Sequence, residues 1–259
     1  MSIHTSGEYE ERGRGLLGAG RAAEALALFE EGCRKFPGDE DLLMGTAMAL
    51  LKLARFEDAC TVLEELRRTR PSGEVLQALV EGYLGRGLLE DATAAAAEAA
   101  REDDARLIHR IARAFYGRSR YREAFPLYER AAELAPDWSE AWFGLGACEW
   151  ALKRPAAAEA ALRRAVELAP EDWQARQFLG CVLCDQGRKD EARVMLESVP
   201  LDAPWQKPAL ERLVALSWWP ADGERGRQME TLWRRVMGGA PSRGALDVLA
   251  EVSRKMDER

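Results

Sequence analysis

A small residue recurs along this chain at an almost constant spacing, and a proline follows four of these residues after twelve positions. Such a period is typical of repeat proteins, in which one repeat buries its apolar face only by stacking on its neighbours. The sequence therefore predicts a solenoid of stacked repeats. The small residues, at steps of 34, 33, 32, 34 and 34, are Ala25, Ala59, Ala92, Ala124, Ala158 and Ala192, and the prolines are Pro37, Pro71, Pro136 and Pro170.

Each period contains two segments in which apolar residues have helical spacing. In the most regular period, Trp142, Leu145 and Gly146 fall on one face of a first helix. Leu162 and Ala165 fall on one face of a second helix. A proline then ends the second helix, because it lacks an N–H donor and its ring clashes with the preceding turn. No strand-like alternation of comparable length occurs, so each repeat is predicted to be a pair of helices.

This pattern resembles the tetratricopeptide repeat family, whose repeat is a helix–turn–helix of about 34 residues. The resemblance implies an all-α fold, namely a right-handed α-solenoid of about six helix–turn–helix repeats with a divergent C-terminal helical cap. Small residues at positions 8 and 20 of a repeat are expected to let its two helices approach closely. The repeats are expected near residues 6–39, 40–73, 74–104, 105–138, 139–172 and 173–200.

The repeat register is lost in residues 201–259. Prolines near the start of this region interrupt helical continuity, and Met229 and Trp233 then resume the spacing of a second helix. We expect a degenerate seventh helical pair and a capping helix here, since the end of a solenoid needs a polar outer face. Self-association through this region is the alternative, because a surplus of apolar surface is often buried by a second copy. Four of the eight tryptophans lie in it: Trp205, Trp218, Trp219 and Trp233.

The composition excludes several classes of protein. The 259 residues include 37 Lys and Arg against 44 Asp and Glu, a net charge of −7 at pH 7, whereas nucleic-acid binders need cationic surfaces to neutralise phosphates. No signal-peptide pattern occurs at the N-terminus, and no stretch of 18 uncharged apolar residues predicts a membrane helix. The odd count of five cysteines favours a reducing compartment. We expect a cytoplasmic protein that binds neither nucleic acid nor a membrane.

No pattern of residues points to catalysis, to a metal or to a cofactor. The chain has two histidines. The glycines from Gly13 to Gly18 match the string of dinucleotide-binding proteins, but that motif works only between a strand and a helix, and no strand precedes it. Cys181 and Cys184 have metal-ligand spacing without a second Cys or His pair nearby. We therefore expect a non-catalytic protein without catalytic residues, metal ligands or cofactor.

Charge is distributed unevenly along the repeats. Residues 1–104 have a net charge of −9, whereas residues 105–138, which form the fourth expected repeat, have a net charge of +3. The family resemblance implies that the first helix of each repeat lines a concave groove. The first three repeats place residues with little charge excess there, such as Met48 and Gln77. The expected groove residues are Arg106, His109, Arg110, Arg113 and Tyr116 in the fourth repeat, Phe143 and Trp150 in the fifth, and Gln177 in the sixth.

This groove predicts a cationic surface next to an uncharged aromatic one. Arginine recognises carboxylates with a planar fork, and an exposed aromatic side chain in a concavity is a typical binding anchor. We expect a protein-interaction scaffold or adaptor whose peptide or protein ligand carries an acidic residue next to apolar anchors. Packing of Phe143 and Trp150 against a neighbouring repeat, with solvated arginines, is the alternative for these residues.

Two other functions remain open from the sequence. One is a self-associating assembly factor or chaperone that forms a homo-oligomer through the tryptophan-rich C-terminal region. The other is a regulatory subunit of a larger complex.

Overall fold

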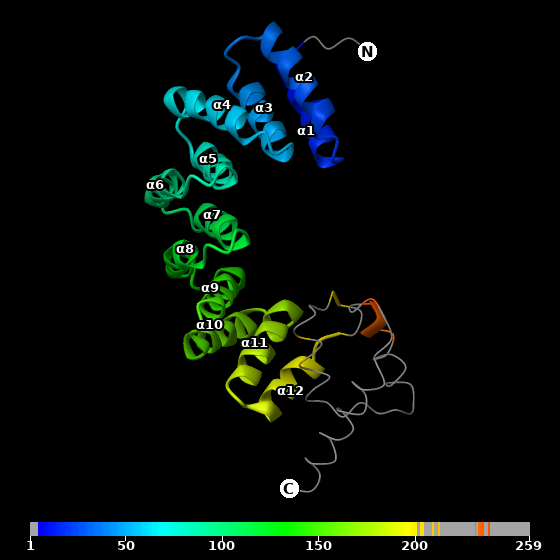
Figure 1. Ribbon diagram of the computed structural model, residues 1–259, viewed down its shortest axis with the longest axis vertical. Coiled ribbons are helices and arrows are strands. Elements are labelled where there is room, and N and C mark those ends of the chain that lie inside the picture. Colours follow the sequence, from blue (N-terminus) through cyan, green and yellow to red (C-terminus); the bar gives the residue numbers. More distant parts are fainter. Residues whose placement is uncertain are drawn as a thin grey trace, which may run out of the picture. The chain divides into compact units, whose positions relative to one another are not determined.

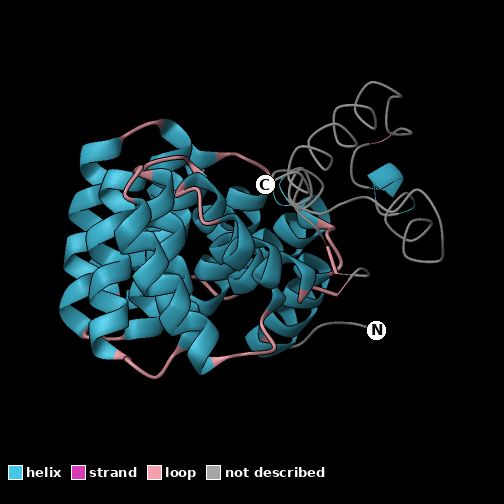
Figure 2. Cartoon of the chain, turned by 90° about the horizontal axis from the view of Figure 1, so that it is seen from below, coloured by secondary structure: helices cyan, strands magenta, loops and turns pink. Residues whose placement is uncertain are grey.

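The structure, a computed structural model, describes residues 5–200, 203–204, 209, 212, 231, 233–235 and 238. Its secondary structure is helical throughout, and no strand occurs within these ranges (Figure 2). The all-α prediction is confirmed. The chain divides into an N-terminal unit, Met1–Leu134, and a C-terminal unit, Ala135–Arg259, and each is described by itself. The seventh helical pair and the capping helix expected over residues 201–259 lie outside the described residues, apart from a few positions.

The N-terminal unit consists of helix pairs stacked in chain order. The first helices of successive pairs, α1, α3, α5 and α7, contact one another and form one layer. The second helices form the other layer, and Figure 1 shows α5 and α7 on one side with α6 and α8 on the other. The helices are α1 (Ser6–Gly18), α2 (Ala22–Lys35), α3 (Glu40–Lys52), α4 (Phe56–Thr69), α5 (Gly73–Arg86), α6 (Leu89–Ala99), α7 (Ala105–Gly117) and α8 (Tyr121–Leu134), with a 3-10 turn at Ala100–Glu102.

The C-terminal unit continues the same hairpin pattern. Its described helices are α9 (Ser139–Ala151), α10 (Pro155–Leu168), α11 (Trp173–Asp185) and α12 (Lys189–Glu197). Each helix packs on the next, and α11 also contacts α9, so the first helices of the two pairs are again neighbours.

Glycine at position 8 of a repeat allows its two helices to pack closely. A Cβ atom added to Gly146 would lie 2.6 Å from Cγ of Leu162 on the paired helix, and one added to Gly180 would lie 2.6 Å from Cγ of Leu196. At Gly13 the added Cβ would lie 2.3 Å from the ring of Phe29. The close approach expected from small residues at this position is therefore present in both units.

First and second helices have different kinds of N-terminus. Most first helices start at a residue whose side-chain oxygen accepts hydrogen bonds from the first turn, which satisfies N–H groups that have no partner within the helix. Second helices lack such a bond where their caps are described, and they follow a turn with one left-handed residue. The side-chain caps are Thr5, Asp39, Ser72, Asp104 and Asp172.

The left-handed residue occupies the same position in every described repeat, and glycine fills it in only half of them. Glycine adopts positive φ without a Cβ clash, whereas other residues are strained there. The series, with φ in degrees, is Gly20 (74), Ala54 (57), Gly87 (77), Ser119 (57), Lys153 (63) and Gly187 (77).

Glycine at the strained positions is expected to stabilise the protein. Each of Ala54→Gly, Ser119→Gly and Lys153→Gly should raise the free energy of unfolding by about 0.5–1 kcal/mol, because relief of the left-handed strain exceeds the extra entropy of an unfolded glycine. Urea unfolding followed by circular dichroism measures the change. The reverse exchange, Gly87→Ala, is the control and should cost about 1 kcal/mol. Loss of stability in all three glycine variants would contradict the role assigned to this turn.

Candidate functional site

The layer of first helices in the N-terminal unit carries a pocket of about 530 Å³, which we call the groove pocket. Helices α3, α5 and α7 each contribute side chains, and Phe56 at the start of α4 joins them. Its floor combines apolar and cationic groups. The lining residues are Met48, Leu51, Lys52, Phe56, Gln77, Glu81, Leu84, Arg110, Arg113, Ala114, Gly117 and Arg118.

Helix α7 presents arginines to this surface because its other face is buried. Its N-cap Asp104 accepts hydrogen bonds from the backbone N–H groups of Arg106 and Leu107, at 2.9 and 3.1 Å. From that start the apolar residues fall on one side and form part of the core. Arg106, Arg110 and Arg113 are spaced by four and three residues, so they share the exposed side, and Arg110 and Arg113 line the pocket whereas Arg106 does not.

The groove pocket has an excess of positive charge. Lys52, Arg110, Arg113 and Arg118 face one carboxylate, Glu81. Within the described part of the chain, none of these four cations has a carboxylate oxygen within 4 Å. Their attraction for an external anion is therefore not cancelled by a neighbouring acid.

Neutral contacts position two of these cations. Arg110 Nε donates a 2.7 Å hydrogen bond to Oε1 of Gln77, whose Nε2 donates to Glu81 at 3.3 Å. The guanidinium carbon of Arg118 lies 5.8 Å from the centre of the Phe56 ring. Such contacts orient a guanidinium group and leave its charge available.

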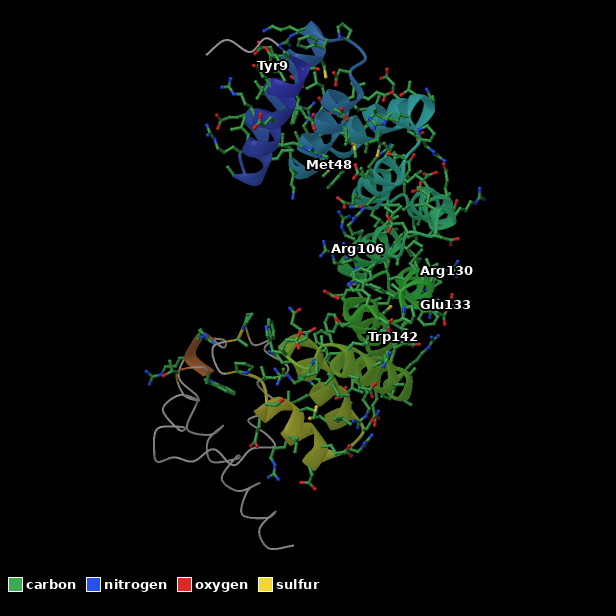
Figure 3. The ribbon with its side chains drawn as sticks, turned by 180° about the vertical axis from the view of Figure 1, so that it is seen from behind. Tyr9, Met48, Arg106, Arg130, Glu133 and Trp142 are labelled. Carbon is green, nitrogen blue, oxygen red and sulfur yellow. The ribbon has the colours of Figure 1, made fainter. Side chains whose placement is uncertain are left out.

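The other side of the same unit shows a different arrangement. On α8, Arg130 forms ion pairs with Asp103 at 2.7 Å and with Glu133 at 3.2 Å. Figure 3 shows Arg130 and Glu133 on this side, and Met48 and Arg106 on the side of the first helices. Arg130 is thus neutralised within the chain, in contrast to Arg113.

His109 and Tyr116 do not line the groove pocket, although both were predicted as groove residues. The His109 ring lies 5.3 Å from the ring of Tyr128 in an edge-to-face arrangement. Tyr116 packs in the same manner on Tyr121 and Tyr128, at 5.1 and 6.3 Å. Both side chains lie on the flank of α7 that faces α8, since both rings contact Tyr128 of that helix. They share this flank because residues seven positions apart lie on one side of a helix.

The predicted aromatic residues belong to the C-terminal unit, where they pack on the next repeat. The rings of Phe143 and Trp150 approach Phe178 edge to face, at 5.1 and 5.5 Å. Gln177 is buried, with 1 % of its surface exposed, so it offers little to a ligand. The structure thus shows the packing that the sequence left as the alternative for Phe143 and Trp150. Because the arginines lie in the other unit, their expected proximity to these rings stays a prediction.

Trp150 has further partners within its own chain. Its Nε1 donates a 2.7 Å hydrogen bond to Oδ2 of Asp185 at the end of α11. Arg212 donates to Oδ1 of the same carboxylate at 2.8 Å, and its guanidinium carbon lies 5.6 Å from the centre of the Trp150 ring. Sequence reasoning missed Asp185 and Arg212, which are 27 positions apart and lie in different segments.

The described residues give no support to metal or thiolate chemistry. No group of three or more His, Cys, Asp or Glu side chains comes together in the described ranges as metal ligands would. Burial raises the pKa of the Cys181 thiol to about 12, so this residue is a protonated thiol at neutral pH. Among the described helices, none has the length and apolarity to cross a membrane.

Family comparison identifies the repeats. One model of the tetratricopeptide repeat matches residues 16–81 and 149–216, which together make up more than half of the chain. A second model with the same description matches residues 109–172. The chain belongs to the tetratricopeptide repeat family. This assignment, with the helix pairs described above, confirms the α-solenoid and indicates a protein-interaction scaffold.

Solved structures of other proteins share this fold. The C-terminal part of a TPR repeat-containing protein from Cytophaga hutchinsonii has a TM-score of 0.63 at 14% identity, and the match covers 92% of this chain and 98% of that one. PilF from Pseudomonas aeruginosa has a TM-score of 0.60 at 18% identity, covering 82% and 97%. The APC/C hetero-tetramer Cut9–Hcn1 gives 0.57 at 17% identity, covering 81% of this chain and 42% of the matched chain. No curated protein matches the sequence.

The tetratricopeptide register explains which lining residues sequence reasoning overlooked. Met48 and Gln77 stand at groove positions, but the groove positions of their repeats carry little charge excess, in contrast to those of the fourth repeat. Lys52 and Arg118 stand at or just after the ends of first helices, outside the groove positions that the family resemblance implies. These residues can be found by comparing the side chains at corresponding positions of three successive first helices, with the helix ends included.

Proposed function

We propose that this tetratricopeptide repeat protein is a non-catalytic scaffold whose groove pocket binds a segment of a protein partner with an acidic residue beside an apolar one. The observation that supports this most directly is the set of four cations without a carboxylate within 4 Å in the described chain, around an apolar floor. Arg110 and Arg113 supply the guanidinium forks for a carboxylate. Met48, Leu51 and Leu84 supply the apolar contact.

The size of the pocket fits such a segment. A volume of about 530 Å³ holds a few side chains and not a folded domain. The overall charge of −7 favours a peptide with a few acidic residues over a nucleic acid. A nucleic acid extends beyond the pocket, where the net negative charge of the protein repels its phosphates. One structural neighbour, Cut9–Hcn1, is by its description a hetero-tetramer of two kinds of chain, which agrees with a scaffold role.

Selection from a short-peptide display library tests the proposal. We expect peptides that bind the full chain to share Asp or Glu beside Leu, Ile or Phe. The double variant Arg110→Glu, Arg113→Glu should weaken their binding about tenfold to a hundredfold, because each lost charge-assisted hydrogen bond is replaced by repulsion. Fluorescence polarisation measures the affinity, which should also fall as salt is added.

A matched control uses an arginine on the opposite side of the same unit. Arg130→Glu changes the charge by the same amount per residue on α8 and should leave peptide affinity unchanged. Selected peptides without acidic residues, or equal binding by the double variant and the wild type, would overturn the proposed function.

A further inference from the structure

An arginine from beyond the helical repeats occupies the aromatic surface of the C-terminal unit. Arg212 lies against Trp150 on α9 and Asp185 on α11, two helices that also contact each other. We call the surface formed by Trp150, Phe178 and Asp185 the arginine site. It is separate from the groove pocket, which belongs to the N-terminal unit, and its charge preference is the opposite.

The arginine site is held in place by contacts that do not involve Arg212. The Trp150 ring packs edge to face on Phe178 at 5.5 Å, and Phe178 is itself buried. The indole N–H donates to Oδ2 of Asp185 at 2.7 Å and so fixes the carboxylate beside the ring. The second carboxylate oxygen, Oδ1, is the one that accepts from Arg212. A ring face and a directed carboxylate oxygen are thus arranged in advance for one donor group.

This combination selects for a guanidinium group. A cation over an indole face is attracted by the negative potential of the ring, and arginine adds planar stacking and directed N–H donors to this attraction. Partial burial of Asp185 opposes its ionisation, but hydrogen bonds from Arg212 and Trp150 outweigh this effect and lower its pKa below the ordinary value. The carboxylate that meets the guanidinium group is therefore ionised at neutral pH, and it disfavours an acidic ligand.

The contact with Arg212 remains partly open to solvent. The side chains of Arg212 and Asp185 keep 28% and 38% of their surface exposed. Ion pairs that water still reaches are weak, and cation–π contacts at exposed sites are comparably modest. A second arginine can therefore approach the same surface and compete with Arg212.

We propose that the arginine site is a second docking surface, which takes an arginine from a partner segment and which Arg212 fills until that partner displaces it. Arg212 then acts as a tethered competitor that sets the affinity threshold for the partner. A tethered group competes at an effective concentration that a free ligand must exceed, so removal of the tethered arginine strengthens binding without adding any contact.

A labelled peptide that copies residues 206–216, and so presents Arg212 in trans, serves as the probe. The full-length Arg212→Ala variant should bind this peptide about tenfold more tightly than the wild type, since the internal competitor is gone. Replacing the arginine of the peptide by alanine should remove most of the affinity. Adding Asp185→Asn to the Arg212→Ala chain should cancel the gain. Arg193→Ala, which removes an exposed arginine of α12, is the matched control and should leave the wild-type affinity unchanged.

The indole N–H resonance of Trp150 gives a second readout, assigned by its loss in Trp150→Phe. It should shift in the Arg212→Ala variant and return toward its wild-type position when the arginine peptide is added. Arg212→Gln, which keeps a long polar side chain, replaces the alanine variant if circular dichroism shows lost helicity. Equal peptide affinity with and without Arg212, or a resonance that the peptide does not move, would show that Arg212 is a fixed anchor and would overturn the proposal.

Discussion

Replacing Phe29 by alanine is expected to lower the free energy of unfolding of the N-terminal unit by about 3–5 kcal/mol. The side chain is completely buried. Its ring fills the space beside two glycines on α1 and α3, because a Cβ atom added to Gly13 or Gly45 would lie 2.3 Å from it. The variant would leave a cavity between three helices. Glycine has no side chain that can move into such a cavity, so little of the loss is recovered.

Urea unfolding measures the total loss, and hydrogen exchange shows where it occurs. In a solenoid each repeat is stabilised by its neighbours, so protection should fall most in α1, α2 and α3. Glu30→Ala changes the next residue along α2, which is exposed, and should stay within about 0.5 kcal/mol of the wild type. A loss below about 1 kcal/mol for Phe29→Ala would mean that the ring is not the core contact described.

The same chemical change at two glycines is expected to have opposite signs. Gly146→Ala should destabilise the C-terminal unit by about 1–3 kcal/mol, since the added methyl group overpacks the interface with α10. Its Cβ would lie 2.6 Å from Cγ of Leu162 and 3.1 Å from the backbone nitrogen of that residue. Gly15→Ala should stabilise the protein by about 0.5–1 kcal/mol, because it removes a glycine from a helix. A Cβ at Gly15 meets no atom within 4 Å.

The two variants control for each other, because both replace a helical glycine by alanine. Urea unfolding gives the difference between their free energies of unfolding, about 1.5–4 kcal/mol. If Gly146→Ala were as stable as Gly15→Ala, close helix approach would not be the reason for a small residue at position 8. Gly180→Ala repeats the test in the next hairpin, where Cγ of Leu196 lies 2.6 Å from the added Cβ.

Part of the candidate site was predictable from composition and helical spacing. The excess of arginine in one repeat predicted a cationic surface, and the spacing of Arg106, Arg110 and Arg113 placed these residues on one side of a helix. The same reasoning assigned His109 and Tyr116 to the groove, whereas both turn toward α8. Periodicity fixes which residues share a helix face, but it does not fix how far each face is rotated toward its neighbours.

The sequence alone determined the helical hairpins, their period and the small residues that let them pack. These properties are local and repeat many times, so each repeat adds independent support for the same pattern. Only the tertiary structure decided which cations stay without an acidic neighbour, and that Arg212 meets Trp150 and Asp185. The physical reason is that ion pairs and ring contacts join single residues far apart in the chain. No period marks such residues, and their meeting depends on how the helices pack.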